Sequence, residues 1–415
     1  MNTIKDFECT RCHHHFSRDK SWLTCPDCHG ILEINYDYEA LAKMKLKDCW
    51  KKTPMSDIWR YLPLIGIDST RGSETLRVGN TPLYHASRLG AHLNLPNLFV
   101  KDEGMNPTQS LKDRASVVAA LQALEQHRPV IACASTGNAA SSLAGNAAKL
   151  GLSAVIFVPA RAPAGKMAQL LAYDATVIRV EGDYQAAFSL SQAAIDRFGW
   201  VNRNAAINPF LIEGKKTVAL EIAEQMDYGH LDWVVVSVGD GCTIGGVYKG
   251  FYDLQRLGYI DHIPRILGVQ ADGCNPFYQS FISKKPLEPM AENTVADSIA
   301  VGIPRNPFKA FRAVEKSAGS WVSVTDQKIL EGMRLLGKME GIFAEPAAAA
   351  GIAGLIQAVE TGIINKTDTV VCISTGNGLK DTKTALTALK EPISLPNDLT
   401  KMIDYFTQYE GALTQ

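Results

Sequence analysis

The sequence lacks an excess of charge of either sign, and it lacks a long apolar run. Lys and Arg number 42 against 43 Asp and Glu, which leaves a net charge of −1. Without a basic surplus the chain has no bulk attraction for phosphate backbones or anionic lipids, so general nucleic-acid and membrane-surface binders are disfavoured. Apolar stretches such as residues 346–356 are shorter than the roughly 18 residues of a membrane span. Charged residues follow the first few positions, where a secretory signal would be apolar, so we expect a cytoplasmic protein.

Two common catalytic strings are also missing. The sequence contains neither the P-loop string G-x-x-x-x-G-K-[ST] nor the G-x-S-x-G string of a nucleophile elbow. A P-loop nucleotide site and an elbow-type hydrolase both lose support. The chain has 415 residues, 46% of them hydrophobic and 20% charged, which is too long for one ordinary core. We therefore expect two or more domains.

Four of the nine cysteines form two C-x2-C pairs near the amino terminus. Cys9 and Cys12 make the first pair, Cys25 and Cys28 make the second, and twelve residues separate the pairs. This spacing is typical of a ribbon whose four thiolates close a tetrahedral zinc site. The alternative is a pair of incidental or redox C-x-x-C motifs. A closed shell leaves no open position for chemistry, so the expected zinc is structural, in a ribbon that acts as a lid or a docking element.

From about residue 80 the chain alternates short Val- and Ile-rich runs with longer helical patterns. The strand candidates are residues 98–100, 129–133, 154–158, 176–180, 233–238, 266–269 and 369–373. This alternation predicts an α/β fold of parallel strands with covering helices and with sites at the carboxyl ends of strands. Before it, residues 37–51 have the pattern of one basic amphipathic helix.

A glycine-bearing turn follows one of these strands. Residues 236–246 read Val-Ser-Val-Gly-Asp-Gly-Cys-Thr-Ile-Gly-Gly, the layout that directs backbone N–H groups and a helix N-terminus at an anion. We expect a phosphate there. The dinucleotide fingerprint is a poor match, because Ile244 stands where its third glycine belongs. The plain alternative is a tight turn without a ligand.

A lysine segment elsewhere in the chain favours the phosphate interpretation of that turn. Asn106-Pro-Thr-Gln-Ser-Leu-Lys-Asp-Arg114 resembles the Schiff-base lysine segment of threonine synthases, which are pyridoxal-phosphate enzymes of fold type II. Further matches occur in the family's order: Gly79-Asn-Thr-Pro-Leu83, Ser135-Thr-Gly-Asn138, Pro163-Ala-Gly-Lys-Met-Ala-Gln169, Glu213-Gly-Lys-Lys-Thr217, Tyr248-Lys-Gly-Phe251, Glu345-Pro-Ala-Ala-Ala349 and Thr375-Gly-Asn-Gly-Leu-Lys-Asp381. The resemblance implies a zinc ribbon over residues 1–37, a large cofactor-binding α/β domain over 38–125 and 205–415, and a small mobile α/β domain over 126–204.

The resemblance also implies residue roles. Lys112 would carry pyridoxal 5′-phosphate as a Schiff base and then move protons. Asn138 would reach the ring hydroxyl, Thr375 (or its neighbour Ser374) would meet the pyridine nitrogen, and the cofactor phosphate would lie in a turn made by Gly239, Asp240, Gly241, Cys242 and Thr243. A hydroxyl at that nitrogen tempers the electron sink and suits elimination and replacement at the substrate side chain. Substrate-binding residues would be Ser135 and Thr136 for the carboxylate and Lys166, with no partner beyond a small amino-acid substrate and a second copy in a homodimer.

Departures from the family pattern leave the substrate open. Leu211 stands where many threonine synthases have an Arg that helps to hold the phosphate of O-phosphohomoserine, and it cannot form a bidentate clamp. Ala139 replaces the usual Thr, and Asn377 replaces a His. The candidates for a replacement cation are Lys166, Lys215, Arg161 and Arg305.

We therefore expect a threonine synthase that converts O-phospho-L-homoserine and water to L-threonine and phosphate. The alternatives in the same cofactor class are β-replacement on O-phosphoserine or O-acetylserine, and a serine/threonine ammonia-lyase. An alternative of another class is a zinc-ribbon binding protein with a catalytically dead α/β body. Intact Lys112 and Asn138 argue against that last alternative.

Overall fold

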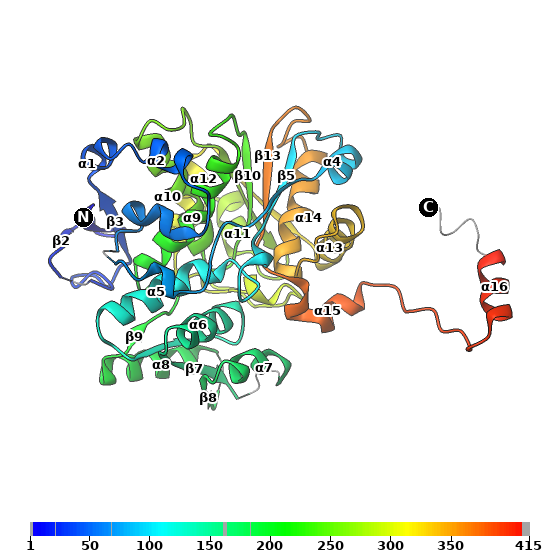
Figure 1. The fold of residues 1–415 in the computed structure, drawn as a ribbon, viewed down its shortest axis with the longest axis horizontal. Coiled ribbons are helices and arrows are strands. Elements are labelled where there is room, and N and C mark those ends of the chain that lie inside the picture. The colour runs from blue at the N-terminus through cyan, green and yellow to red at the C-terminus, as the bar shows by residue number, and fades with distance from the viewer. Residues whose placement is uncertain (1–2, 21, 68, 161–163, 183, 409–415) are drawn as a thin grey trace.

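The computed structural model describes residues 3–20, 22–67, 69–160, 164–182 and 184–408. Strands lie in three sheets, and helices cover both faces of the two larger sheets (Figure 1). No helix among the described residues is long and apolar enough to cross a membrane. A fold of α/β type with largely parallel sheets, as predicted, is confirmed.

The large sheet has the strand order β12-β11-β10-β13-β5-β4. All adjacent strands of this sheet are parallel, except that β4 is antiparallel to β5. The bounds are β4 (Leu83–His85), β5 (Leu98–Asp102), β10 (Trp233–Ser237), β11 (Arg265–Ala271), β12 (Ser320–Val324) and β13 (Val370–Ser374). β10 and β13 are buried along their whole length, which explains why they read as continuous apolar runs in the sequence.

Alternate residues of these strands face two helical layers. Val234 and Val236 pack against α9 (Phe210–Gln225), α10 (Cys242–Arg256) and α12 (Pro307–Lys316). Trp233 and Val235 point the other way, toward α4 (Ser87–Leu93), α13 (Asp326–Glu340) and α14 (Pro346–Glu360). Because successive side chains of a strand point to opposite faces of the sheet, the two faces of this sheet belong to two different hydrophobic cores. Helix α11 (Pro276–Ser283) follows β11.

The small sheet is fully parallel, in the order β8-β7-β6-β9. Its strands are β6 (Val130–Ala134), β7 (Ser153–Pro159), β8 (Thr176–Val180) and β9 (Val201–Asn202). One face packs against α5 (Lys112–Glu125), α6 (Asn138–Lys149) and α7 (Ala164–Ala172), and the other against α8 (Tyr184–Phe198). Helix α5 lies between the two larger sheets, because it also contacts α9.

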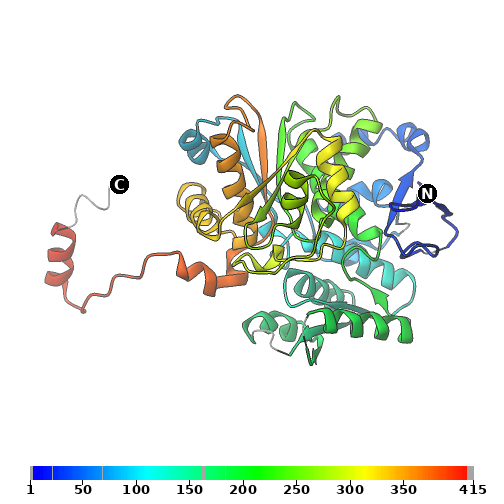
Figure 2. The same cartoon turned by 180° about the vertical axis from the view of Figure 1, so that it is seen from behind.

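The amino-terminal ribbon consists of β1 (Ile4–Cys9), β2 (His15–Ser17) and β3 (Leu32–Tyr36) in an antiparallel sheet. The ribbon packs on the layer formed by α9, α10 and α12, where the Tyr36 hydroxyl donates to Glu213 (2.7 Å) and Lys309 Nζ donates to the Leu32 carbonyl (2.7 Å). It lies at one end of the molecule in both views (Figures 1 and 2). Our expectation of a lid was therefore wrong: the ribbon docks on the outside of a helical layer.

The expected single helix over residues 37–51 was also wrong. The structure has α1 (Tyr38–Lys43) and α2 (Leu46–Lys52), separated by Lys45 in the left-handed region at φ 49°. This break turns the chain so that Leu41 and Trp50 both reach the core. Short helix α3 (Leu62–Ile65) follows.

Residues 382–408 form an arm that projects away from the body in both views (Figures 1 and 2). This arm contains α15 (Thr382–Thr387) at its base and α16 (Leu399–Gln408) near its end. Ala385 of α15 is buried against the large sheet's core, but most larger apolar side chains of the arm are exposed, among them Leu386, Leu399 and Ile403.

Candidate active site

Lys112 is the first residue of α5, and the preceding loop is fixed by its own polar groups. The Asp113 carboxylate accepts hydrogen bonds from the Thr108 backbone N–H and hydroxyl, both at 2.7 Å. Burial raises the pKa of Asp113 to about 6. The Leu111 N–H donates to the Thr375 carbonyl at 2.9 Å, which ties the lysine loop to the end of β13.

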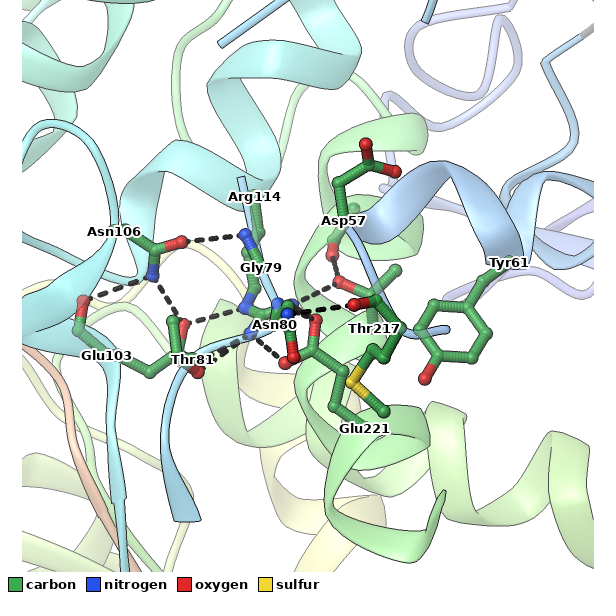
Figure 3. A network of polar contacts seen from close by, with 12 residues as sticks. Asp57, Tyr61, Gly79, Asn80, Thr81, Glu103, Asn106, Arg114, Thr217 and Glu221 are labelled. Carbon is green, nitrogen blue, oxygen red and sulfur yellow. Dashed lines mark hydrogen bonds and ion pairs between the residues drawn. The ribbon is translucent and has the colours of Figure 1, made fainter. Parts of the chain in front are cut away.

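A buried charge network holds α5 in place (Figure 3). Arg114 is fully buried and donates two hydrogen bonds to Glu103 (2.6 and 2.7 Å) and two to Glu221 (both 2.7 Å). Lys101 donates to Glu221 at 2.8 Å, so two cations face two carboxylates. Asn80 N–H donates to Glu221 at 2.9 Å. The Gly79–Leu83 and Asn106–Arg114 segments, noted separately in the sequence, are therefore parts of one scaffold around the lysine.

Lys112 lies in the wall of a cavity of about 580 Å³ between the two larger sheets. The same cavity is lined by four residues predicted from the sequence to bind cofactor or substrate: Ser135, Thr136, Asn138 and Asp240. The other expected cofactor residues are not part of its lining; they are Gly239, Gly241, Cys242, Thr243 and Thr375.

Those residues nevertheless lie near the lysine. Burial lowers the pKa of Lys112, the charge of Arg203 lowers it further, and Glu345, Cys242 and Asp240 raise it. The turn that begins α10 is thus close enough to Lys112 to act on its charge. Thr375 is buried directly after β13, and its carbonyl accepts the Leu111 hydrogen bond.

The glycines of this turn leave no room for side chains. Gly241 has φ +85°, and a Cβ there would lie 2.7 Å from the Asn306 carbonyl oxygen. A Cβ at Gly239 would lie 3.1 Å from Ile299 Cα. The first N–H groups of a 15-residue helix follow at Cys242. A turn in which only glycine fits, followed by a helix N-terminus, is typical of a phosphate site, so the turn is compatible with the cofactor phosphate.

Glu345 was noted in a sequence motif, but it was given no role. Its carboxylate accepts a 2.7 Å hydrogen bond from Asn138 Nδ2, and burial raises its pKa to about 7. A Cβ at Gly376 would lie 2.5 Å from Glu345 Oε1, which explains the glycine. Lys380 Nζ lies nearby and donates to the Thr108 carbonyl (2.7 Å) and to Gln169 (2.8 Å).

Sequence reasoning missed Arg203. This residue is buried, lines the cavity with Lys112, and donates from Nε to Ser116 Oγ at 2.9 Å. One arginine in the segment Val201-Asn-Arg-Asn204 gives no sequence signal, because the burial that sets it apart depends on β6 and α5.

The other candidate cations differ in position. Leu211 is buried in the apolar cluster of the small sheet, so no cation occupies its position. Lys215 is buried, and burial lowers its pKa to about 8. Arg305 lines the cavity with its guanidinium 3.7 Å from the ring centre of Phe188. Arg161 and the side chain of Lys166 lie outside the described part of the chain.

The four ribbon thiols converge. Sγ of Cys9 lies 3.5 Å from Sγ of Cys28, Sγ of Cys12 lies 3.7 Å from Sγ of Cys25, and all four sulfur atoms are within 4.8 Å of one another. Four sulfurs around zinc at about 2.3 Å would be roughly 3.8 Å apart, so the geometry fits that ion. A Cβ at Gly30 would lie 2.7 Å from Cys9 Sγ.

This fold and site correspond to a known class of enzyme. A family model for pyridoxal-phosphate dependent enzymes matches residues 74–376. Threonine deaminase isoform 2 from Solanum lycopersicum, in its processed form, superposes with a TM-score of 0.67 at 21% identity, over 80% of this chain and 92% of that one. Maize serine racemase gives a TM-score of 0.63 at 20% identity, over 81% and 94%. The chain is thus a pyridoxal-phosphate-dependent enzyme with the fold type II architecture.

Curated relatives narrow the family. Threonine synthase of Methanosarcina acetivorans is 39% identical over 388 residues, which cover 93% of this chain and 94% of the relative. Threonine synthase of Methanocaldococcus jannaschii is 38% identical over 395 residues, or 94% and 96%. The chain belongs to the threonine synthase family, and the resemblance in its motifs is confirmed.

Proposed function

We propose that this enzyme releases phosphate from O-phospho-L-homoserine and adds water, which gives L-threonine. The observation that carries the proposal is the juxtaposition of Lys112, Asn138 and the Ser135–Thr136 turn around one cavity, in a chain of this family. The cavity, about 580 Å³, has room for a cofactor and an amino acid.

The residues present fit pyridoxal phosphate. We assign its covalent link to Lys112, its phosphate to the turn of Gly239, Asp240, Gly241, Cys242 and Thr243, its ring hydroxyl to Asn138 and its pyridine nitrogen to Thr375. Ser374 Oγ is buried without a hydrogen-bond partner among the described residues, so it stays an alternative to Thr375. When bound, the cofactor withdraws electrons from the substrate carbons.

Lys112, in the wall of the cavity, is placed to move protons at a bound substrate. Burial and Arg203 favour the neutral amine, since both lower the pKa of Lys112. A neutral amine accepts a proton from substrate carbon and returns it at another position. Ser135 and Thr136 bind the substrate carboxylate in this proposal, and Lys166 approaches the substrate phosphate.

Lys112 is tested by borohydride reduction of the cofactor-loaded enzyme, followed by peptide mapping. We expect the pyridoxyl label on Lys112 and no label in Lys112→Ala. A label on another lysine in the wild-type enzyme would contradict the assignment.

The reaction is tested by a substrate screen. O-phosphohomoserine should release phosphate and yield threonine, while serine, threonine, O-acetylserine and O-phosphoserine turn over far more slowly. The second candidate, β-replacement or ammonia-lyase chemistry, is favoured by Leu211, whose side chain is buried among apolar neighbours. An enzyme that turns over only a serine derivative or threonine would decide for that candidate.

We also propose a structural zinc on Cys9, Cys12, Cys25 and Cys28, which the sulfur geometry supports. A homodimer and a cytoplasmic location complete the proposal. None of the nine cysteines forms a disulfide, which is consistent with a reducing compartment. The exposed apolar side chains of the carboxyl-terminal arm support assembly with another copy. The domain boundaries at residues 37, 125 and 204 stay part of the proposal.

A further inference from the structure

Arg203 is a buried cation beside the proposed reaction centre. It directly follows β9, and its N–H donates to the Ala132 carbonyl at 3.0 Å, which continues the pairing of β9 with β6. Only 2% of the residue is exposed, yet it belongs to the lining of the cavity that contains Lys112. Arg203 therefore lies at the wall of the same cavity, and its charge is close enough to lower the pKa of Lys112.

One edge of the guanidinium is anchored and another is free. Nε donates to Ser116 Oγ at 2.9 Å, and that hydroxyl lies 2.6 Å from Ser142 Oγ. Nη2 is buried and has no hydrogen-bond partner among the described residues. No carboxylate forms an ion pair with Arg203 in the part of the chain that the structure describes.

Arg114 provides the comparison within the same molecule. It is equally buried, but its guanidinium is neutralised by Glu103 and Glu221. Burying a cation without a counter-charge is strongly unfavourable, and proteins normally supply a partner. A buried arginine that lies at a cavity wall without a counter-charge therefore indicates that its counter-ion is a ligand, and the planar fork of arginine matches a phosphate.

The two other candidate cations whose side chains the structure describes are less suited to this ligand. Lys215 packs on α10, where its Cβ lies 3.0 Å from the Cβ position of Gly246. It is thus held against the helix that begins at the turn assigned to the cofactor phosphate. Arg305 already covers the ring of Phe188 and donates to Gln185 at 3.4 Å.

We propose that Arg203 binds the distal phosphate of the substrate and thereby replaces the arginine that position 211 lacks. This inference rests on the proposed function for the identity of the anion. Arg203 acts as a specificity-determining residue, because it favours binding of amino acids that carry a distal dianion. The hydrogen bond to Ser116 fixes the orientation of its guanidinium group.

The test measures ligand binding to the cofactor-loaded enzyme. L-2-amino-5-phosphonopentanoate carries a distal dianion but no leaving group, and norvaline has a similar carbon chain without the charge. We expect Arg203→Gln to weaken binding of the phosphonate by about 10- to 100-fold, the scale of one or two charge-assisted hydrogen bonds. Norvaline binding, read from the cofactor absorbance, should change less than twofold.

Two controls separate this role from a structural one. Arg128→Gln removes an exposed cation that donates to the Gly199 carbonyl, and it should leave both affinities unchanged. The cofactor-free Arg203→Gln protein should melt at the wild-type temperature or above it, because an unpaired buried charge is lost. Its affinity for pyridoxal phosphate should also equal that of the wild type.

Several results would overturn the inference. An unchanged phosphonate affinity in Arg203→Gln would refute it, and so would a loss in Arg305→Gln instead. A parallel loss of cofactor affinity would assign Arg203 to the cofactor phosphate. Phosphate release from O-phosphohomoserine by the wild-type enzyme tests the proposed function separately. If the wild-type enzyme releases no phosphate but binds the phosphonate through Arg203, the anion site is supported and the proposed reaction is refuted.

Discussion

Replacing Arg114 with methionine tests the charge network that positions Lys112. Methionine keeps the unbranched apolar stem, but it removes the guanidinium and its four hydrogen bonds to Glu103 and Glu221. Both carboxylates then stay buried, with Lys101 as the remaining cation of the network. Removal of one partner from a buried ion pair costs about 3–5 kcal/mol, because the remaining charge is uncompensated. We expect that loss of unfolding free energy at pH 7.

The loss should depend on pH in a defined direction. Arg114 and Lys101 lower the pKa of Glu221 to about 2 against an ordinary value near 4.5, although burial acts in the opposite sense. A lowered carboxyl pKa contributes stability that is present above the ordinary value and is lost as the pH falls toward the folded one. Arg114→Met removes most of this contribution. The difference between wild type and variant should therefore be largest at neutral pH and shrink as the pH falls from about 5 toward 2.

Urea denaturation of the cofactor-free proteins, followed by tryptophan fluorescence, measures the difference. Arg71→Met is the matched control, because Arg71 forms an exposed ion pair with Glu74, and it should cost less than about 1 kcal/mol. Arg114→Met/Glu221→Gln should recover part of the loss, since it removes one orphaned carboxylate. A cost of Arg114→Met equal to that of Arg71→Met would refute our account of the scaffold.

Three further predictions concern other parts of the chain. Cys12→Ser should abolish zinc binding, measured by elemental analysis, and increase proteolysis within residues 1–50. Cys49→Ser, outside the cluster, should change neither. Full metal retention by Cys12→Ser would exclude the site. Glu345→Gln should gain unfolding free energy relative to wild type as the pH rises from about 4.5 to about 7, by about 3 kcal/mol in total. The reason is that the folded wild type holds the carboxyl proton that its unfolded chain releases. A difference that does not change with pH would mean that Glu345 ionises normally. Lys380→Met should lower the unfolding free energy by about 1.5–3 kcal/mol through loss of its hydrogen bonds to Thr108 and Gln169, and a wild-type denaturation curve would contradict this.

The sequence predicted the two central strands of the large sheet, which are buried on both faces. Residues 233–238 and 369–373 were identified because parallel central strands are apolar at every position, and the structure has β10 and β13 there. Strand β12 escaped notice because Ser320 and Ser323 interrupt its apolar run. Strand β9 has two residues, too few for any periodic pattern.

The candidate site was predictable where a local string carries the chemistry. Lys112 follows from its neighbours in the chain, and so does the Ser135–Asn138 turn. The partners of these residues do not, because they come from distant segments: Asn138 donates to Glu345, 207 positions away. The Nη2 group of Arg203, buried without a hydrogen-bond partner among the described residues, is likewise a property of the folded chain and has no counterpart in the sequence around residue 203.

The strand order of the large sheet constrains how the chain is made. β13, which lies between β10 and β5, pairs residues Val370–Ser374 with Leu98–Asp102. At a synthesis rate of about 5–20 residues per second, β5 waits roughly 15–50 s on the ribosome for this neighbour. Until then β5 and β10 each present an unpaired edge, and the small sheet is completed first, because its strands lie within residues 130–202. We therefore expect a long stage of synthesis in which the small sheet is complete while the central sheet still lacks β13, and in which the open edges of β5 and β10 offer a binding surface to nascent-chain chaperones.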